Sequence, residues 1–171
     1  VDKISMEEIA READYGKGSL YNYFSSKNDL LWCLIHRTLD NFLQSNTREL
    51  EKVRTFKLKI RKVIEISINL LESDPTIFEL WDYIEMNLQT GRNTAVEKER
   101  LAGILSFLQF FADLFEDAMR TGELRKNDPM MLSIIMFSMI RSVYKSGKLG
   151  IITCSQEEKA EFILDLFFNQ P

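Results

Sequence analysis

Apolar residues recur every three or four positions along most of the chain, which is the spacing of one face of an α-helix. The apolar positions of the stretch 55–72 show this most clearly: Phe56, Ile60, Val63, Ile64, Ile68 and Leu71. Pro75 suits the first turn of a helix, and Gly122 suits a helix end. Helices are expected over residues 6–13, 27–47, 55–72, 75–89, 95–121, 130–146 and 156–169, with a short helix between the first two. Only three prolines and seven glycines interrupt 171 residues, so we predict an all-α fold.

Residues that cap helices are concentrated near the N-terminus. Ser5 followed by Glu8 forms a capping-box pattern for the first helix. Asp14 lies where this helix must turn, and aspartate tolerates a left-handed backbone better than most residues. Gly16 is the expected N-cap of the short helix, and Ser26 that of the long helix after it. A helix, a tight turn, a short helix and a long helix in this order are typical of a helix-turn-helix.

The short helix carries chemistry suited to a nucleic-acid groove. Leu20 and Phe24 are four residues apart, so both can anchor it to the rest of the protein. The outward positions are left to Lys17, Ser19, Tyr21, Asn22 and Tyr23. Lysine can donate to phosphates or to guanine, asparagine can pair with adenine, and hydroxyl groups bond phosphates.

This region resembles the DNA-binding region of the TetR family of bacterial and archaeal repressors. The resemblance rests on IAREA at residues 9–13 and on KGSLYNYFSSKNDLL at residues 17–31. Three turn residues depart from the family pattern: Asp14 replaces a glycine, Tyr15 a smaller aliphatic residue, and Gly16 a Ser or Thr cap. Few residues precede the first expected helix, so we expect that the sequence is truncated and lacks the family's first helix.

The resemblance implies a helix-turn-helix head at residues 1–34 and a larger helical body for effector binding and dimerisation at residues 35–171. It also implies a set of DNA-binding residues in the head. These candidates are Ser5, Lys17, Gly18, Ser19, Tyr21, Asn22, Tyr23 and Lys27.

Charge argues mildly against a nucleic-acid partner. The chain carries a net charge of −4, and residues 1–31 hold four basic against six acidic residues. The acids fall on the first helix and around the caps rather than on the short helix. Lys27 is in the first turn of a helix, where the dipole disfavours a cation and a bound phosphate would offset that cost. The stretch 48–62 holds seven basic and two acidic residues, which is usually a solvated helix face and only secondarily a DNA contact.

Composition and motifs favour a cytoplasmic protein that is not an enzyme. No apolar run approaches the ~20 residues needed to cross a bilayer, so we expect no membrane partner. Cys33 and Cys154 are far apart and fit a reducing compartment. The single histidine, His36, is expected to be structural, and there is no phosphate loop, metal pattern or nucleophile motif. We therefore expect no catalytic residue, no metal and no cofactor.

The last two helices are apolar on more than one face, which favours a homodimer. In the TetR family the two C-terminal helices of each subunit form a four-helix interface. The candidates are Met136, Ile140, Phe162, Ile163, Leu166 and Phe167. The alternative is that all these positions belong to the internal core.

The middle helices are rich in aromatic residues and methionine. Such stripes are usually core, but the resemblance implies an effector cavity among these helices. The candidates are Glu79, Trp81, Asp82, Tyr83, Met86, Phe107, Phe111 and Phe115, and the expected ligand is a small hydrophobic or amphipathic effector. A ligand that prefers a conformation with wrongly spaced recognition helices would shift the population away from the DNA-competent state.

Together these features predict a DNA-binding transcriptional regulator. It would act as a ligand-relieved repressor, a homodimer on a palindromic double-stranded DNA operator. The alternative is an all-α dimeric binding module that senses a hydrophobic molecule or partner without sequence-specific DNA binding.

Overall fold

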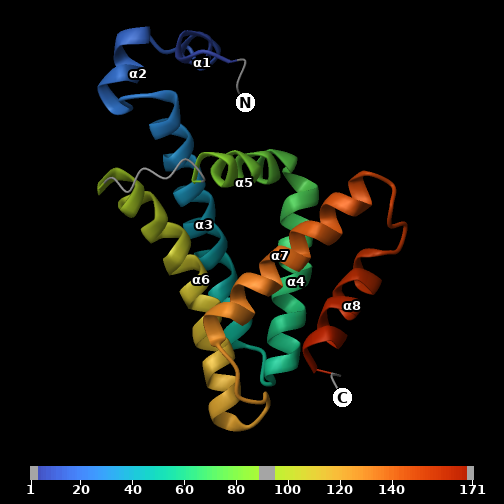
Figure 1. Cartoon of the computed structure of the whole chain (residues 1–171). Coiled ribbons are helices and arrows are strands. Elements are labelled where there is room, and N and C mark those ends of the chain that lie inside the picture. Colours follow the sequence, from blue (N-terminus) through green and yellow to red (C-terminus); the bar gives the residue numbers. More distant parts are fainter. Residues whose placement is uncertain (1–3, 89–94, 169–171) are drawn as a thin grey trace.

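The all-α prediction is confirmed. The computed structural model describes residues 4–88 and 95–168, while the side chains of residues 84–100 lie outside this description. The described residues form eight helices and no strand (Figure 1). Their bounds are α1 Met6–Glu12, α2 Lys17–Tyr23, α3 Lys27–Glu51, α4 Phe56–Ser73, α5 Pro75–Leu88, α6 Ala95–Thr121, α7 Pro129–Lys148 and α8 Gln156–Phe168.

The helix-turn-helix forms through the caps that the sequence predicts. The Ser5 hydroxyl accepts a hydrogen bond from the Glu8 backbone, and the Glu8 carboxylate accepts one from the Ser5 backbone. Asp14 adopts the left-handed conformation with φ of 55°, which turns the chain between α1 and α2. Gly16 is the N-cap of α2, and the Ser26 hydroxyl caps α3. The head is therefore ordered by local hydrogen bonds.

A single helix joins this head to the body. Leu31 and Trp32 are buried near the start of α3, and Leu39 and Phe42 are buried further along it. In Figure 1 the helices α1 and α2 lie at one end of the molecule, and α3 leads from them to the opposite end. Helix α3 therefore crosses the expected boundary at residue 34 without a break.

The core of the body lies among α3, α4, α6, α7 and α8. Helix α6 packs against α3 and α7, and α4 packs against α5, α7 and α8. The largest fully buried side chains include Ile60, Ile64, Phe111, Phe115 and Ile163. Helix α5 lies across the end of the body nearest the head (Figure 1). None of the helices in the described residues is both long and apolar enough to span a bilayer.

Two helices run further than the sequence pattern indicates. Helix α3 continues to Glu51, because Leu50 is buried in the body and extends the apolar face by one turn. Helix α7 continues to Lys148. Gly122 follows α6 with φ of 80°, as expected for a helix end that needs a left-handed residue.

Candidate DNA-binding surface and ligand cavity

Helix α2 lies on the surface of the protein along its whole length. None of its seven residues, all within the described part of the chain, is buried. Tyr21 is 44% exposed and Tyr23 is 76% exposed, and Ser19 and Asn22 are exposed beside them. Leu20 is half-buried, as an anchor should be. Ser19, Tyr21, Asn22 and Tyr23 of this helix are therefore accessible to another molecule.

Gly18 is a position without a side chain on the exposed surface of α2. A Cβ atom built on Gly18 would meet no atom of the described residues within 4 Å. The glycine is therefore not required by packing within the protein. A position without a side chain on an exposed helix allows the backbone of a partner to approach closely.

Lys17 is held by the helix before it. Its ammonium group forms an ion pair and hydrogen bond with the Glu7 carboxylate of α1. This hydrogen bond lowers the pKa of Glu7 and raises the pKa of Lys17. Both side chains are largely exposed, so the pair ties α1 to α2 only weakly. A phosphate near Lys17 would have to compete with Glu7.

The two outlying candidates have different surroundings. Ser5 is exposed, and its hydroxyl is occupied as a helix cap. Lys27 is half-buried at the start of α3, one residue before Asn28.

The basic stretch 48–62 lies at the end of the body opposite the helix-turn-helix (Figure 1). Its Arg61 pairs with Glu161 of α8, so it does not extend the surface formed by α2.

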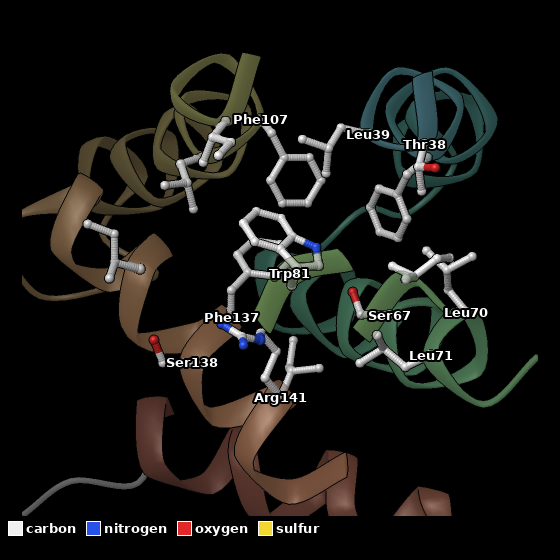
Figure 2. A pocket seen from close by; sticks show the side chains of 16 residues that line it. Thr38, Leu39, Ser67, Leu70, Leu71, Trp81, Phe107, Phe137, Ser138 and Arg141 are labelled. Carbon is white, nitrogen blue, oxygen red and sulfur yellow. The ribbon is translucent and has the colours of Figure 1, made fainter. Parts of the chain in front are cut away.

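A cavity of about 190 Å³ lies inside the body. Helices α3, α4, α5, α6 and α7 line it, mainly with apolar side chains. Figure 2 shows Trp81 in the middle of this space, with Phe107 and Leu39 on one side and Arg141 and Ser138 on another. The cavity is therefore apolar over most of its wall and polar at one end.

The cavity contains two of the eight effector candidates. Trp81 and Phe107 line it. Asp82 lies next to it and binds Arg141 with an Oδ1–Nη2 distance of 2.8 Å. The Tyr83 hydroxyl donates a hydrogen bond to the Asn28 side chain of α3 instead.

Three of the other four candidates, all described by the structure, do not line it. Glu79 is exposed on α5. The prediction is wrong for Phe111 and Phe115 as cavity residues, because both are fully buried in aromatic packing. The side chain of Met86 lies outside the described residues.

The sequence reasoning missed Arg141, Thr38, Ser67 and Ser138, the polar residues of the cavity. Arg141 stands out in the sequence as a charge within an apolar helix, and this is the one signal that could have found it. Groups of His, Cys, Asp and Glu that could hold a metal ion are absent from the part of the chain that the structure describes.

Residues 1–32 match the family model for bacterial regulatory proteins of the tetR family. The helix-turn-helix region is therefore that of the TetR family. It is also similar to curated transcriptional regulators. An HTH-type regulator from Staphylococcus aureus USA300 is 25% identical over 134 residues, which is 78% of this chain and 68% of the relative. An uncharacterised HTH-type regulator from Haemophilus influenzae is 27% identical over 77 residues, or 45% of this chain and 41% of the relative.

Solved structures share the TetR-family fold. FadR from Bacillus subtilis, in complex with stearoyl-CoA, has a TM-score of 0.77 at 19% identity, covering 98% of this chain and 88% of that one. AibR, in complex with isovaleryl coenzyme A and operator DNA, has a TM-score of 0.70 at 18% identity with the same coverage. These relatives are regulators and not enzymes, as the sequence predicts.

The expected dimer surface of this chain needs correction. Met136, Ile140 and Ile163 are at most 1% exposed, so they belong to the core of the protomer and cannot contact a partner. Both helices carry apolar side chains on more than one face, so the sequence pattern could not separate the inner face from the outer face. Phe162 is 62% exposed and Leu166 is 44% exposed, whereas Phe167 is half-buried.

Proposed function

We propose that this TetR-family regulator binds operator DNA with α2 in the major groove. The observation that carries the proposal is the exposed polar and aromatic face of α2 together with the open position at Gly18. An α-helix fits the major groove, where side-chain donors reach base edges. Tyr21, Asn22 and Tyr23 would meet bases and phosphates, and Lys17 and Lys27 would meet phosphates.

The same proposal includes a homodimer formed through α7 and α8. Met131 and Ile135 of α7 are 53% and 42% exposed, and they join Phe162 and Leu166 of α8 on the surface. Ile135 and Leu166 line one groove of about 310 Å³, which brings the exposed sides of α7 and α8 together there. A two-fold axis there would present two α2 helices to a palindromic operator, about 34 Å apart.

The cavity would hold an effector that relieves repression. A ligand beside Trp81 would act on α5, and Tyr83 of α5 is hydrogen-bonded to Asn28 at the start of α3. Asn28 is adjacent to Lys27, so a shift of α5 would move one of the proposed DNA contacts. The ligand would thereby favour a conformation that does not match the operator. The acyl-CoA molecules bound by FadR and AibR support an amphipathic effector.

Operator binding implies that the protein works in the cytoplasm. The alternative function, a binding module without DNA recognition, rests on the acidic head and on Glu7, which holds Lys17. The match of the helix-turn-helix to the tetR family model disfavours it.

Gel retardation tests the proposal, using the full-length protein and DNA from upstream of its own gene. Wild type should retard this DNA at modest salt. Tyr21→Ala and Lys27→Ala should abolish or strongly weaken retardation, because each removes a contact on or beside α2. Arg120→Ala is the control, since Arg120 lies at the end of α6 far from the head (Figure 1) and forms an exposed salt bridge with nearby Asp117. Undiminished retardation by both head variants would refute the assignment of the surface.

A further inference from the structure

The polar end of the cavity is built around a cation. Arg141 projects from α7 beside Trp81, as Figure 2 shows, and its side chain is only 21% exposed. Its guanidinium carbon lies 5.7 Å from the centre of the Phe78 ring and 5.9 Å from the nearest Trp81 ring centre. Aromatic faces and the ion pair with Asp82 hold the guanidinium at this position.

A second cation lies close to the ion pair of Arg141 and Asp82. Lys145, one turn further along α7, lies 4.0 Å from the other carboxylate oxygen of Asp82. Two cations therefore share the Asp82 carboxylate at this end of the cavity. A partly buried positive charge attracts an anion more strongly than a solvated one does.

A second polar group faces the cavity from α4. Ser67 of α4 is 6% exposed, and its buried hydroxyl oxygen has no hydrogen-bond partner among the described residues. Buried hydroxyl groups nearly always have a partner, in the protein or in a bound molecule. In Figure 2 the Ser67 oxygen points into the space near Trp81.

The cavity also has an exit beside Arg141. A second hollow of about 250 Å³ is lined by Phe78, Asp82, Ser142 and Lys145, and it shares Ser138 and Arg141 with the inner cavity. A ligand could therefore place an apolar part inside and a larger headgroup in this outer hollow. Arg141 would stand at the junction between them.

The volume of the inner cavity limits the size of the apolar part of the ligand. An engineered cavity of ~150 Å³ accommodates benzene, with six carbons. In proportion, the inner cavity of about 190 Å³ accommodates a group of about six to eight carbons. Leu39, Phe42 and Phe107 are among the apolar residues that line this space.

We infer that the effector of this protein is a short or medium acyl chain with an anionic headgroup that binds Arg141. This inference rests on the proposed function, whose effector it defines. The anion is a carboxylate or the phosphate of an acyl thioester, and Ser67 donates a hydrogen bond to an oxygen of the ligand. The anion competes with Asp82 for Arg141. Asp82 directly precedes Tyr83 in α5. A movement of Asp82 away from Arg141 would therefore also move Tyr83, which donates the hydrogen bond to Asn28 of α3.

Calorimetry on the full-length protein tests the inference with three probes of equal chain length: octanoate, octanoyl-CoA and 1-octanol. At least one of the two anions should bind about tenfold more tightly than 1-octanol, a difference of about 1.4 kcal/mol. If octanoate binds more tightly than octanoyl-CoA, the anionic group of the effector is a carboxylate. If octanoyl-CoA binds more tightly, it is a phosphate of the coenzyme. Equal affinity for 1-octanol, or no binding of either anion, would overturn the inference.

Variants locate the binding determinant. Arg141→Gln should remove the preference for the anion, and Arg141→Lys should restore part of it because the charge is kept. Lys148→Gln is the matched control, because it removes an exposed cation from the same helix outside the cavity. Ser67→Ala changes few contacts and should weaken anion binding severalfold. An undiminished preference in folded Arg141→Gln and Ser67→Ala would overturn the inference.

Operator retardation by the same proteins separates the two proposals. If the anions do not bind but wild type retards operator DNA, the ligand inference is wrong and the proposed DNA-binding function stands. If neither is observed, both are wrong.

Discussion

Replacing Gly18 by alanine should change the stability of the protein and its affinity for DNA in opposite directions. Alanine is the better helix former by about 0.5–1 kcal/mol. At position 18 the added Cβ would meet no atom of the described residues within 4 Å, so packing does not oppose the change. We expect Gly18→Ala to raise the melting temperature by about 1–4 °C, the shift that this free energy gives in a domain of this size.

The same methyl group should weaken DNA binding. If α2 lies in the major groove, the open surface at Gly18 is where the backbone of the helix approaches the DNA. Loss of one direct contact costs about 1–3 kcal/mol, which corresponds to about 5- to 150-fold in operator affinity. A variant that is more stable and yet binds DNA less tightly is the expected result.

Circular dichroism during heating measures the first effect, and fluorescence anisotropy with a labelled operator measures the second. Gly147→Ala in α7 is the matched control, because its Cβ would meet only the flexible end of Lys159, at 3.2 Å. The control should bind operator like wild type. If Gly18→Ala also binds operator like wild type, the reasoning that places α2 against DNA is refuted.

Three further predictions follow from single contacts. Glu7→Gln should tighten operator binding severalfold at low salt, because it removes the carboxylate that holds Lys17. Lys17 keeps the pKa of Glu7 below its ordinary value of 4.5, so the carboxylate is charged above that pH and the advantage of glutamine should be constant from about pH 6 to 8. Phe162→Glu should dissociate the dimer in analytical ultracentrifugation, since the two lost apolar contacts contribute about 3 kcal/mol, or about a hundredfold in Kd. Tyr83→Phe should reduce the effect of a bound acyl anion on operator affinity by about two- to tenfold, because it removes the hydrogen bond to Asn28.

Each of these predictions has a result that would contradict it. Weaker operator binding by Glu7→Gln would mean that the ion pair orders α2 rather than masking Lys17. Leu105→Glu places the same charge on an exposed apolar position of α6 and should leave the dimer intact, so a dimer that survives Phe162→Glu excludes this part of α8 as the interface. An unchanged effect of the ligand on operator affinity in Tyr83→Phe would mean that the hydrogen bond to Asn28 does not couple the cavity to the head.

The head could be predicted from the sequence because its determinants are local. The capping box of Ser5 and Glu8 and the cap at Ser26 each depend on residues three positions apart. The left-handed turn at Asp14 also depends on the chemistry of one residue. Signals of this kind can be recognised in a sequence without knowing the tertiary fold.

The cavity could be predicted only in part, because it depends on contacts between distant segments. Trp81 and Phe107 line it, but Phe111 on the same helix as Phe107 is packed in the core. An aromatic stripe does not show which of its rings face a void. The ion pair of Arg141 with Asp82 joins residues 59 positions apart, and no local pattern relates them.

Footprinting of the full-length protein on DNA from upstream of its gene tests the central proposal most directly. If two copies of α2 enter successive major grooves, the protein should protect two symmetric stretches of a palindrome. Their centres should lie about 10 base pairs apart or a multiple of this spacing. The absence of protection at modest salt, or a single asymmetric protected stretch, would contradict it.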